Sequence, residues 1–197
     1  MKTVRYFFTP VSPWTYLGHP SFVRMAEQHG AQIQLRPVDL GRVFPVSGGL
    51  PLAKRAPQRQ AYRLQELARW REHRGVPLNI HPKHFPAPAD DAARLIIAAD
   101  LALGTGAGLK LAYALMRAVW AEERNIGDQQ TRETIVSEQG LDAQAIATRT
   151  AEAATAFDAY TEEAIVAQVF GAPWYQIGDH SFWGQDRLEF VERALAA

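Results

Sequence analysis

The pattern of apolar and polar positions predicts a strand at the start of the chain, followed by a helix and a second strand. The run Thr3 to Phe8 is apolar and rich in aromatic residues, which is typical of a buried strand. Apolar residues recur at helical spacing from Pro13 to His29, and Gln32 to Leu35 alternates as a strand does. Because strands joined by a helix usually pair in parallel, this start predicts an α/β fold.

The middle of the chain is expected to contain a loop and then a helical block. The segment from Asp39 to Pro57 is rich in Gly and Pro and predicts a long loop, a kind of segment that often carries function. From about Gln58 to Gln168 the pattern is mostly helical. Two helices end at Gly75 and Gly104, and two or three more follow.

Strand patterns return near the C-terminus. The stretches "WYQIG" and "SFW" flank a Gly-Asp-His turn and predict a hairpin, and a last helix follows from about Gln185 to Leu195. This order of elements predicts a thioredoxin-like core (βαβ…ββα) with a large all-helical insertion. The core would comprise residues 1–38 and 169–197, and residues 39–168 would form the loop and the inserted helical domain.

Composition excludes several classes of function. Lys plus Arg and Asp plus Glu each total 21, and no long basic block occurs, so we expect neither nucleic acid nor an anionic membrane as partner. No apolar run is long enough to span a membrane. The apolar stretch at the N-terminus is broken by Thr9 and Pro10, which argues against a signal peptide. We therefore expect a soluble, cytoplasmic protein.

The chain contains no cysteine, which limits its chemistry further. Disulfides, thiolate zinc sites and a protein thiol nucleophile are all excluded. The six histidines form neither an HxxxH nor an HExxH motif, so we expect no metal. Any sulfur chemistry would need a thiol from another molecule.

Ser12 lies where the first strand gives way to the first helix. Followed by Pro13, it is the expected N-cap of that helix. The free N–H groups of a helix N-terminus also bind anions, and a thiolate is one that a serine hydroxyl can hydrogen bond. In "SPWT", Ser12 and Thr15 have the spacing of a CxxC redox pair, but hydroxyls replace both thiols. Redox chemistry by the protein is excluded, whereas the anion site remains.

Two motifs near the C-terminus carry the next candidates. In "VFGAPW", Pro173 either opens a strand or lies in a cis turn. A cis bond would expose the backbone of Ala172 to a peptide-like ligand for β-type pairing. In "FWGQDR", Gln185 and Asp186 open the last helix and either cap it or bind a ligand, with Asp186 facing an ammonium group.

Aromatic and histidine residues supply weaker candidates. Trp14 and Trp174 would line a flat slot for an aromatic substrate, whereas Tyr16 and Trp183 are expected in the core. In "NIHPKHFPAP", His81 and its neighbour His84 would bind a carboxylate or relay a proton, but a solvated loop is the favoured interpretation.

Three motifs together resemble one known branch of proteins. "FFTPVSPWTYLG", "VFGAPW" and "FWGQDRLEF" are similar to the glutathione-dependent branch of the DsbA-like thioredoxin superfamily. That branch comprises the kappa-class glutathione transferases and the 2-hydroxychromene-2-carboxylate isomerases. The resemblance spans nearly the whole chain, because the helical block corresponds to the insertion of this branch. "SPWTYLG" with "GQDR" favours the isomerases.

The resemblance implies a set of glutathione-binding residues. Ser12 would be catalytic and would orient the glutathione thiolate, and the other binding residues would be Arg59, Ala172, Pro173, Gln185 and Asp186. A family asparagine falls on Gly49 in "SGGLP", so one side-chain contact is missing. Trp174 replaces a smaller family residue and would narrow the pocket.

The resemblance also implies a reaction. It is the interconversion of 2-hydroxychromene-2-carboxylate and trans-o-hydroxybenzylidenepyruvate by reversible addition of the glutathione thiolate. A kappa-like glutathione transferase and a non-catalytic DsbA-like scaffold are the alternatives, and in the scaffold residues 41–57 would dock a protein or peptide. A homodimer formed through the helical block is a further expectation from the resemblance.

Overall fold

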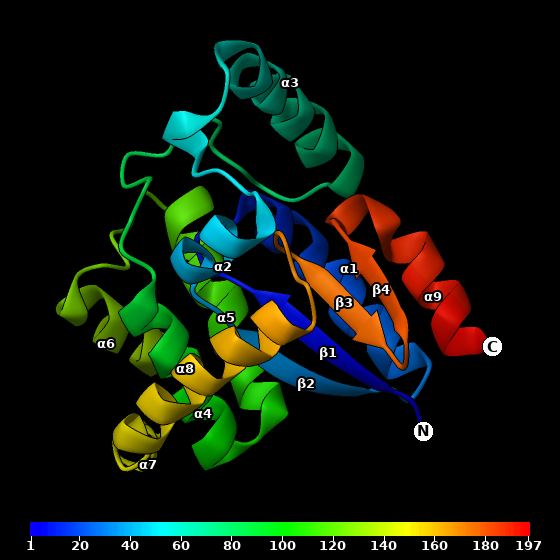
Figure 1. The fold of residues 1–197 in the computed structure, drawn as a ribbon. Coiled ribbons are helices and arrows are strands. Elements are labelled where there is room, and N and C mark those ends of the chain that lie inside the picture. The colour runs from blue at the N-terminus through cyan, green and yellow to red at the C-terminus, as the bar shows by residue number, and fades with distance from the viewer.

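The computed structural model describes residues 1–197 and is built around a four-stranded sheet (Figure 1). Its strands lie in the order β2-β1-β3-β4. The two N-terminal strands pair in parallel, and β3 and β4 continue the sheet in antiparallel fashion. The strands are β1 (Thr3–Phe8), β2 (Gln32–Pro37), β3 (Trp174–Ile177) and β4 (His180–Trp183). This sheet has the βαβ…ββ order of a thioredoxin-like core, as the sequence predicts.

Helices supply most of the remaining chain. The α-helices are α1 (Pro13–Gln28), α2 (Leu40–Ser47), α3 (Pro57–Arg74), α4 (Asp90–Leu103), α5 (Thr105–Trp120), α6 (Gln129–Glu138), α7 (Ala143–Ala147), α8 (Thr150–Val166) and α9 (Leu188–Ala196). Two short 3₁₀ turns, η1 (Leu52–Lys54) and η2 (Gln185–Arg187), precede α3 and α9. None of the helices is both long enough and apolar enough to cross a bilayer.

The prediction of a loop from Asp39 to Pro57 is wrong for most of that segment. The side chain of Asp39 caps α2 by accepting a hydrogen bond from the N–H of Gly41 at 2.7 Å. Val43 is buried on the inner side of this helix, and Gly48 ends it with φ of 76°. Tertiary burial of one apolar side chain thus stabilises a helix that the Gly and Pro content disfavours.

The central strand β1 is buried on both faces. Val4, Tyr6 and Phe8 point into the main core, which they share with α1, α4, α5 and α9. Phe7 points the other way, into a smaller cluster with Trp174 of β3 and side chains of α2 and α8. Helices therefore cover both faces of the sheet, as expected for a strand that is apolar throughout.

Four chain segments that are far apart in the sequence meet at one end of the sheet. β1, β2 and β4 finish at this end, and β3 begins there, because β3 runs antiparallel to its neighbours. Ser12 follows β1, Asp39 follows β2, Pro173 precedes β3 and Gln185 follows β4. α3 lies above the same end of the sheet in Figure 1.

Candidate active site

Ser12 caps α1 and faces the start of β3. Its Oγ accepts a hydrogen bond from the N–H of Thr15 at 3.2 Å and donates a long one, 3.5 Å, to the carbonyl of Ala172. The N–H of Trp14, in the first turn, donates to no group of the chain. No acidic residue lies in that first turn. The positive end of a 16-residue helix is therefore available to an anion next to the Ser12 hydroxyl.

The second position of the CxxC-like spacing has a different environment. Thr15 is fully buried, and its hydroxyl has no hydrogen-bond partner. Ser12, in contrast, lines a cavity. Only the first of the two hydroxyls is thus in contact with the site.

The loop before β3 presents an unused stretch of backbone beside Ser12. The peptide bond between Ala172 and Pro173 is cis. The N–H of Ala172 donates to no group of the chain, and its carbonyl receives only the long contact from Ser12. This arrangement leaves a short extended edge that a peptide-like ligand can pair with.

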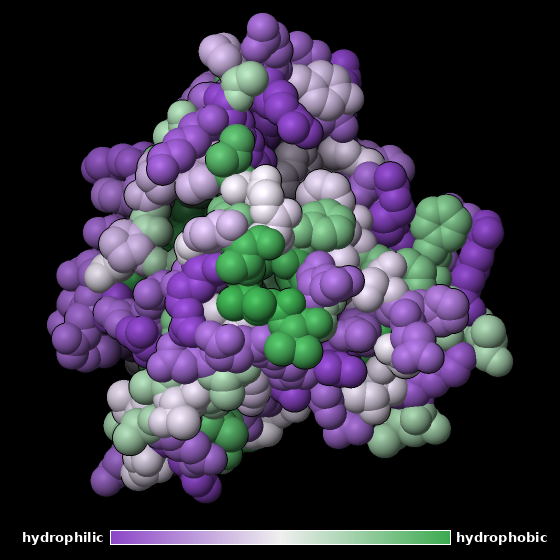
Figure 2. Space-filling view, viewed as in Figure 1, coloured by the Kyte–Doolittle hydropathy of each residue, from purple (hydrophilic) through white to green (hydrophobic).

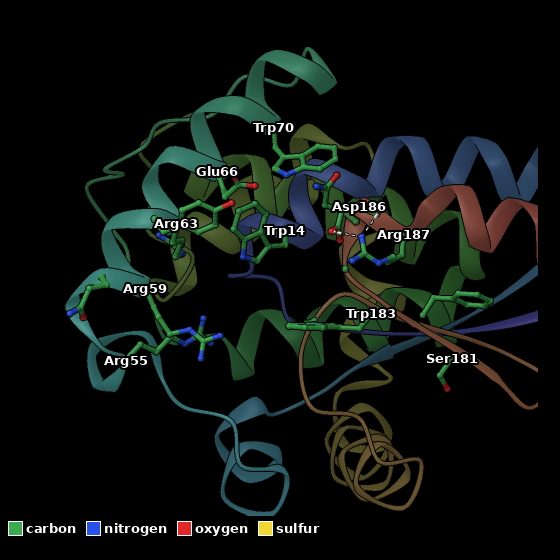
Figure 3. A pocket seen from close by; sticks show the side chains of 16 residues that line it. Trp14, Arg55, Arg59, Arg63, Glu66, Trp70, Ser181, Trp183, Asp186 and Arg187 are labelled. Carbon is green, nitrogen blue, oxygen red and sulfur yellow. Dashed lines mark hydrogen bonds and ion pairs between the residues drawn. The ribbon is translucent and has the colours of Figure 1, made fainter.

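A cavity of about 740 Å³ lies between α3 and the segment that follows β4 (Figure 3). Arg55, Arg59 and Arg63 line one side, and Asp186 and Arg187 line the opposite side. Aromatic side chains complete the walls; they are Trp14, Tyr62, Trp70, Phe182 and Trp183. This volume lies in the usual range for small-molecule sites. We call it the first cavity.

A second cavity of about 340 Å³ adjoins the first and contains Ser12. The two cavities share five lining residues: Trp14, Arg55, Arg63, Ala172 and Trp183. Phe44, Phe85 and Phe170 supply aromatic rings to the second cavity, and Asp39 and Asp90 also line it. On the outer surface, Figure 2 shows apolar residues gathered over α2 and the end of α8, and Val46, Val166 and Phe170 are exposed there.

Gln185 and Asp186 differ in how firmly they are held. Gln185 is buried, and Arg74 donates to its side-chain oxygen at 2.8 Å and to its backbone carbonyl at 2.6 Å. A Cβ on Gly18 would lie 2.5 Å from the Cβ of Gln185, so only glycine permits this approach of α1. Asp186 is exposed and pairs with Arg187 at 2.7 Å. The side-chain amide of Gln185 and the carboxylate of Asp186 therefore remain available to a ligand.

Burial and a neighbouring arginine lower the pKa of each of the two arginines in the shared wall. Burial, together with the charge of Arg55, lowers the pKa of Arg63 to about 10. Burial and the charge of Arg59 also lower the pKa of Arg55. Both side chains remain cationic at neutral pH, in a place where positive charges are crowded.

The structure brings most of the predicted residues together. Arg59, Gln185 and Asp186 line the first cavity, Ser12 lines the second, and Ala172 lines both. The bond before Pro173 is cis, one of the two arrangements considered for it. Trp14 also lines both cavities.

Three other residues lie elsewhere than the sequence predicts or lie outside both cavities. Trp174 is 6% exposed and packs in the smaller cluster, so it lines neither cavity. The expectation that Trp183 is a core residue is wrong, because it is 52% exposed and lines both cavities. A Cβ on Gly171 would lie 2.5 Å from its indole nitrogen, so this glycine lets the ring cover the loop. His81 is exposed and lies in neither cavity.

The surroundings of Gly49 and Tyr16 bear on two further predictions from the sequence. A side chain at Gly49 would collide with the ring of Phe44, so the asparagine that the resemblance implies at this position does not fit here without movement of that ring. Tyr16 is fully buried, as predicted, and donates to the carbonyl of Pro77 at 2.8 Å.

Sequence reasoning missed Arg55, Arg63 and Arg74. The first two recur with Arg59 at a spacing of four residues, and Arg59 and Arg63 therefore lie on one side of α3, whereas Arg55 precedes this helix. Such a row is unfavourable by itself and is a signal of an anion site. No comparable signal exists for Arg74, whose partner Gln185 is 111 positions away in the sequence.

A helix N-terminus that faces a cis-proline at the end of a four-stranded sheet defines the site of a DsbA-like thioredoxin protein. Comparison with known proteins agrees, since the family model of the DSBA-like thioredoxin domain matches residues 3–196. A 2-hydroxychromene-2-carboxylate isomerase of Pseudomonas sp. (strain C18) is 30% identical over 98% of this chain and 89% of its own length.

Further relatives extend this result. The structure of another 2-hydroxychromene-2-carboxylate isomerase superposes with a TM-score of 0.78 at 26% identity, over 98% of this chain and 94% of that one. Glutathione S-transferase kappa 2 of Caenorhabditis elegans is 25% identical over 99% of this chain and 92% of its own. The chain belongs to the 2-hydroxychromene-2-carboxylate isomerase family of the DsbA-like thioredoxin proteins.

Proposed function

We propose that this protein is a glutathione-dependent isomerase that interconverts 2-hydroxychromene-2-carboxylate and trans-o-hydroxybenzylidenepyruvate, or a close analogue. One observation carries the proposal: the Ser12 hydroxyl and the unused backbone of Ala172 face each other where a larger cavity adjoins a smaller one. Two ligands can thus meet at Ser12. The relatives named for this isomerase support the choice of reaction.

The residues present fit glutathione. The free N–H and carbonyl of Ala172 match the cysteinyl part of a peptide, and Asp186 matches an ammonium group. The N–H groups of Gln185 and Asp186 donate to no group of the chain, so a carboxylate would satisfy them. Arg59 forms no ion pair within the chain and would bind the carboxylate at the other end. The kappa-class relative supports the same ligand.

When bound, glutathione would supply a thiolate that adds reversibly to a conjugated carbon of the substrate, which allows rotation about the former double bond. The task of Ser12 is to donate a hydrogen bond to the sulfur and to hold its negative charge at the end of α1. A free thiol has a pKa of about 8.5. Lowering this pKa by one or two units requires about 1.4 to 2.7 kcal/mol. A charge-assisted hydrogen bond and a helix terminus together contribute about this much.

The second cavity supplies the other requirement of the reaction. The aromatic side chains in its lining match a flat bicyclic substrate. No redox step occurs, which agrees with a chain that contains no cysteine.

A kappa-like glutathione transferase is the second candidate, because the Caenorhabditis elegans relative has that name. The two activities differ in what happens to the adduct. A transferase releases it as product, whereas an isomerase returns free glutathione.

Calorimetric titration with reduced glutathione, followed by a spectroscopic assay of isomerisation with and without it, tests the proposal. We expect binding in the micromolar to low-millimolar range, turnover only in the presence of glutathione, and no net consumption of thiol. Absence of binding, or turnover that does not depend on glutathione, would contradict the proposal. Stoichiometric loss of thiol would favour the transferase instead.

A further inference from the structure

Two cations in the wall between the cavities lack a counter-ion. Arg63 has no hydrogen-bond acceptor and no ion pair within the chain, and its guanidinium lies near two aromatic rings. Arg55 donates from Nε to the carbonyl of Leu50 at 2.8 Å and forms no ion pair. A guanidinium carries five N–H donors, so most of the donors of both side chains are unused.

The guanidinium of Arg63 is directed toward the second cavity. Its central carbon lies 5.5 Å from the centre of the Phe85 ring and 5.8 Å from that of Trp120. Phe85 lines the second cavity and not the first, and Trp120 is fully buried behind it. Arg59 differs, because it lines only the first cavity and is exposed.

The carboxylates near this place do not neutralise the two arginines. Asp39 and Asp90 also line the second cavity, but neither forms an ion pair with Arg55 or Arg63. Asp39 instead accepts the capping hydrogen bond from Gly41. Burial and the charge of Asp39 raise the pKa of Asp90. Burial lowers the pKa of both arginines, with the charge of Arg59 acting on Arg55 and that of Arg55 acting on Arg63, which is the expected result when an anionic partner is missing.

We propose that Arg63, assisted by Arg55, binds the carboxylate of a flat aromatic acid in the second cavity and thereby selects substrates that carry this group. The inference rests on the proposed function, and it adds the residue that would bind the carboxylate of the substrate. A carboxylate satisfies paired N–H donors of a guanidinium in two-point fashion, and the rings of Phe44, Phe85 and Phe170 receive the aromatic body. Arg63 is a specificity-determining residue in this arrangement, and Arg59 is left for glutathione.

The test compares the binding of trans-cinnamate and of methyl trans-cinnamate, in which a methyl group removes the carboxylate charge, to the wild-type protein and to Arg63→Gln. We expect the wild-type protein to bind the acid about tenfold more tightly than the ester, as one charge-assisted hydrogen bond predicts. Arg63→Gln should remove this preference and leave the dissociation constant of reduced glutathione within about twofold. Arg69→Gln, an exposed arginine on the same helix, is the matched control and should keep the preference.

Stability provides a second readout. Because Arg63 forms no polar contact in the chain, Arg63→Met should leave the melting temperature unchanged or raise it, whereas a structural role would lower it. Equal binding of acid and ester to the wild-type protein would overturn the inference. It would also be overturned if Arg63→Gln weakened the binding of glutathione as much as the binding of cinnamate. Failure of the proposed function is a separate result, because it would appear as absent glutathione binding while the acid and the ester are still distinguished.

Discussion

Arg74 holds Gln185 by two hydrogen bonds, because it donates to the side-chain oxygen at 2.8 Å and to the backbone carbonyl at 2.6 Å. This contact joins the end of α3 to the segment after β4, and it orients the Gln185 amide at the edge of the first cavity. Arg74 is thus a positioning residue for whatever occupies that end of the cavity.

Arg74→Gln should weaken glutathione binding without changing the catalytic step. Loss of hydrogen bonds from a charged donor, each worth about 1.5 to 3 kcal/mol, releases Gln185. We expect the KM for glutathione to rise about tenfold and kcat to change little. Arg149→Gln, at an exposed ion pair on α8, is the control and should change neither. A fall in kcat with an unchanged KM would contradict a positioning role.

Ser12→Ala should separate catalysis from stability. Loss of the N-cap costs about 1 kcal/mol, which corresponds to a decrease in melting temperature of about 2–4 °C for a chain of this size. Turnover should fall by at least about tenfold, and the pKa of the bound glutathione thiol, followed by its ultraviolet absorbance, should rise.

Asp128→Ala removes the N-cap of α6, where the side chain accepts from Thr131 N–H at 2.8 Å, and it is the matched control for stability. It should destabilise the protein by a similar amount and leave turnover intact. Equal activity of the Ser12→Ala and wild-type proteins would exclude Ser12 from the mechanism.

Thr15→Val should be tolerated although Thr15 occupies the second position of the CxxC-like spacing. The Thr15 hydroxyl is buried and unpaired, so replacing it with a methyl group removes an unsatisfied polar atom. We expect an unchanged or higher melting temperature and unchanged turnover. A large loss of activity would show that this hydroxyl takes part in the reaction.

His19 should make the stability of the protein depend on pH. It is buried, its Nδ1 lies 3.2 Å from the Tyr6 hydroxyl, and its Nε2 lies 3.2 Å from the carbonyl of Leu109. A neutral ring satisfies both contacts if Nε2–H donates and Nδ1 accepts. Burial lowers its pKa to about 4, well below the ordinary value of about 6.5.

Between these two pKa values the unfolded chain binds a proton at His19 that the folded chain does not bind. The free energy of unfolding is therefore fully retained above about pH 6.5 and is lost as the pH falls, by roughly 3 kcal/mol at pH 4 from this group alone. Urea titrations across this range would measure the loss. His19→Gln should have a flatter dependence, and the same slope in both proteins would assign the effect to other groups.

Local signals in the sequence were sufficient for the secondary structure around the site and for Ser12. Strand ends, a serine N-cap and a proline at the first helical position are determined by neighbouring residues, and the structure has them where predicted. Trp183 and the pair Arg74–Gln185 depend on contacts between distant segments. Burial of Val43 likewise determines α2, and no pattern within residues 39–57 indicates it.

The hydroxyls at positions 12 and 15 have a chemical consequence under the proposed function. An enzyme that carries its own reactive thiol is permanently inactivated when an alkylating reagent such as iodoacetamide modifies that thiol. Here the reagent would consume only the dissolved tripeptide, because the chain has no cysteine to modify. Removal of the reagent and addition of fresh glutathione would restore full turnover, because the reactive group can be replaced from solution.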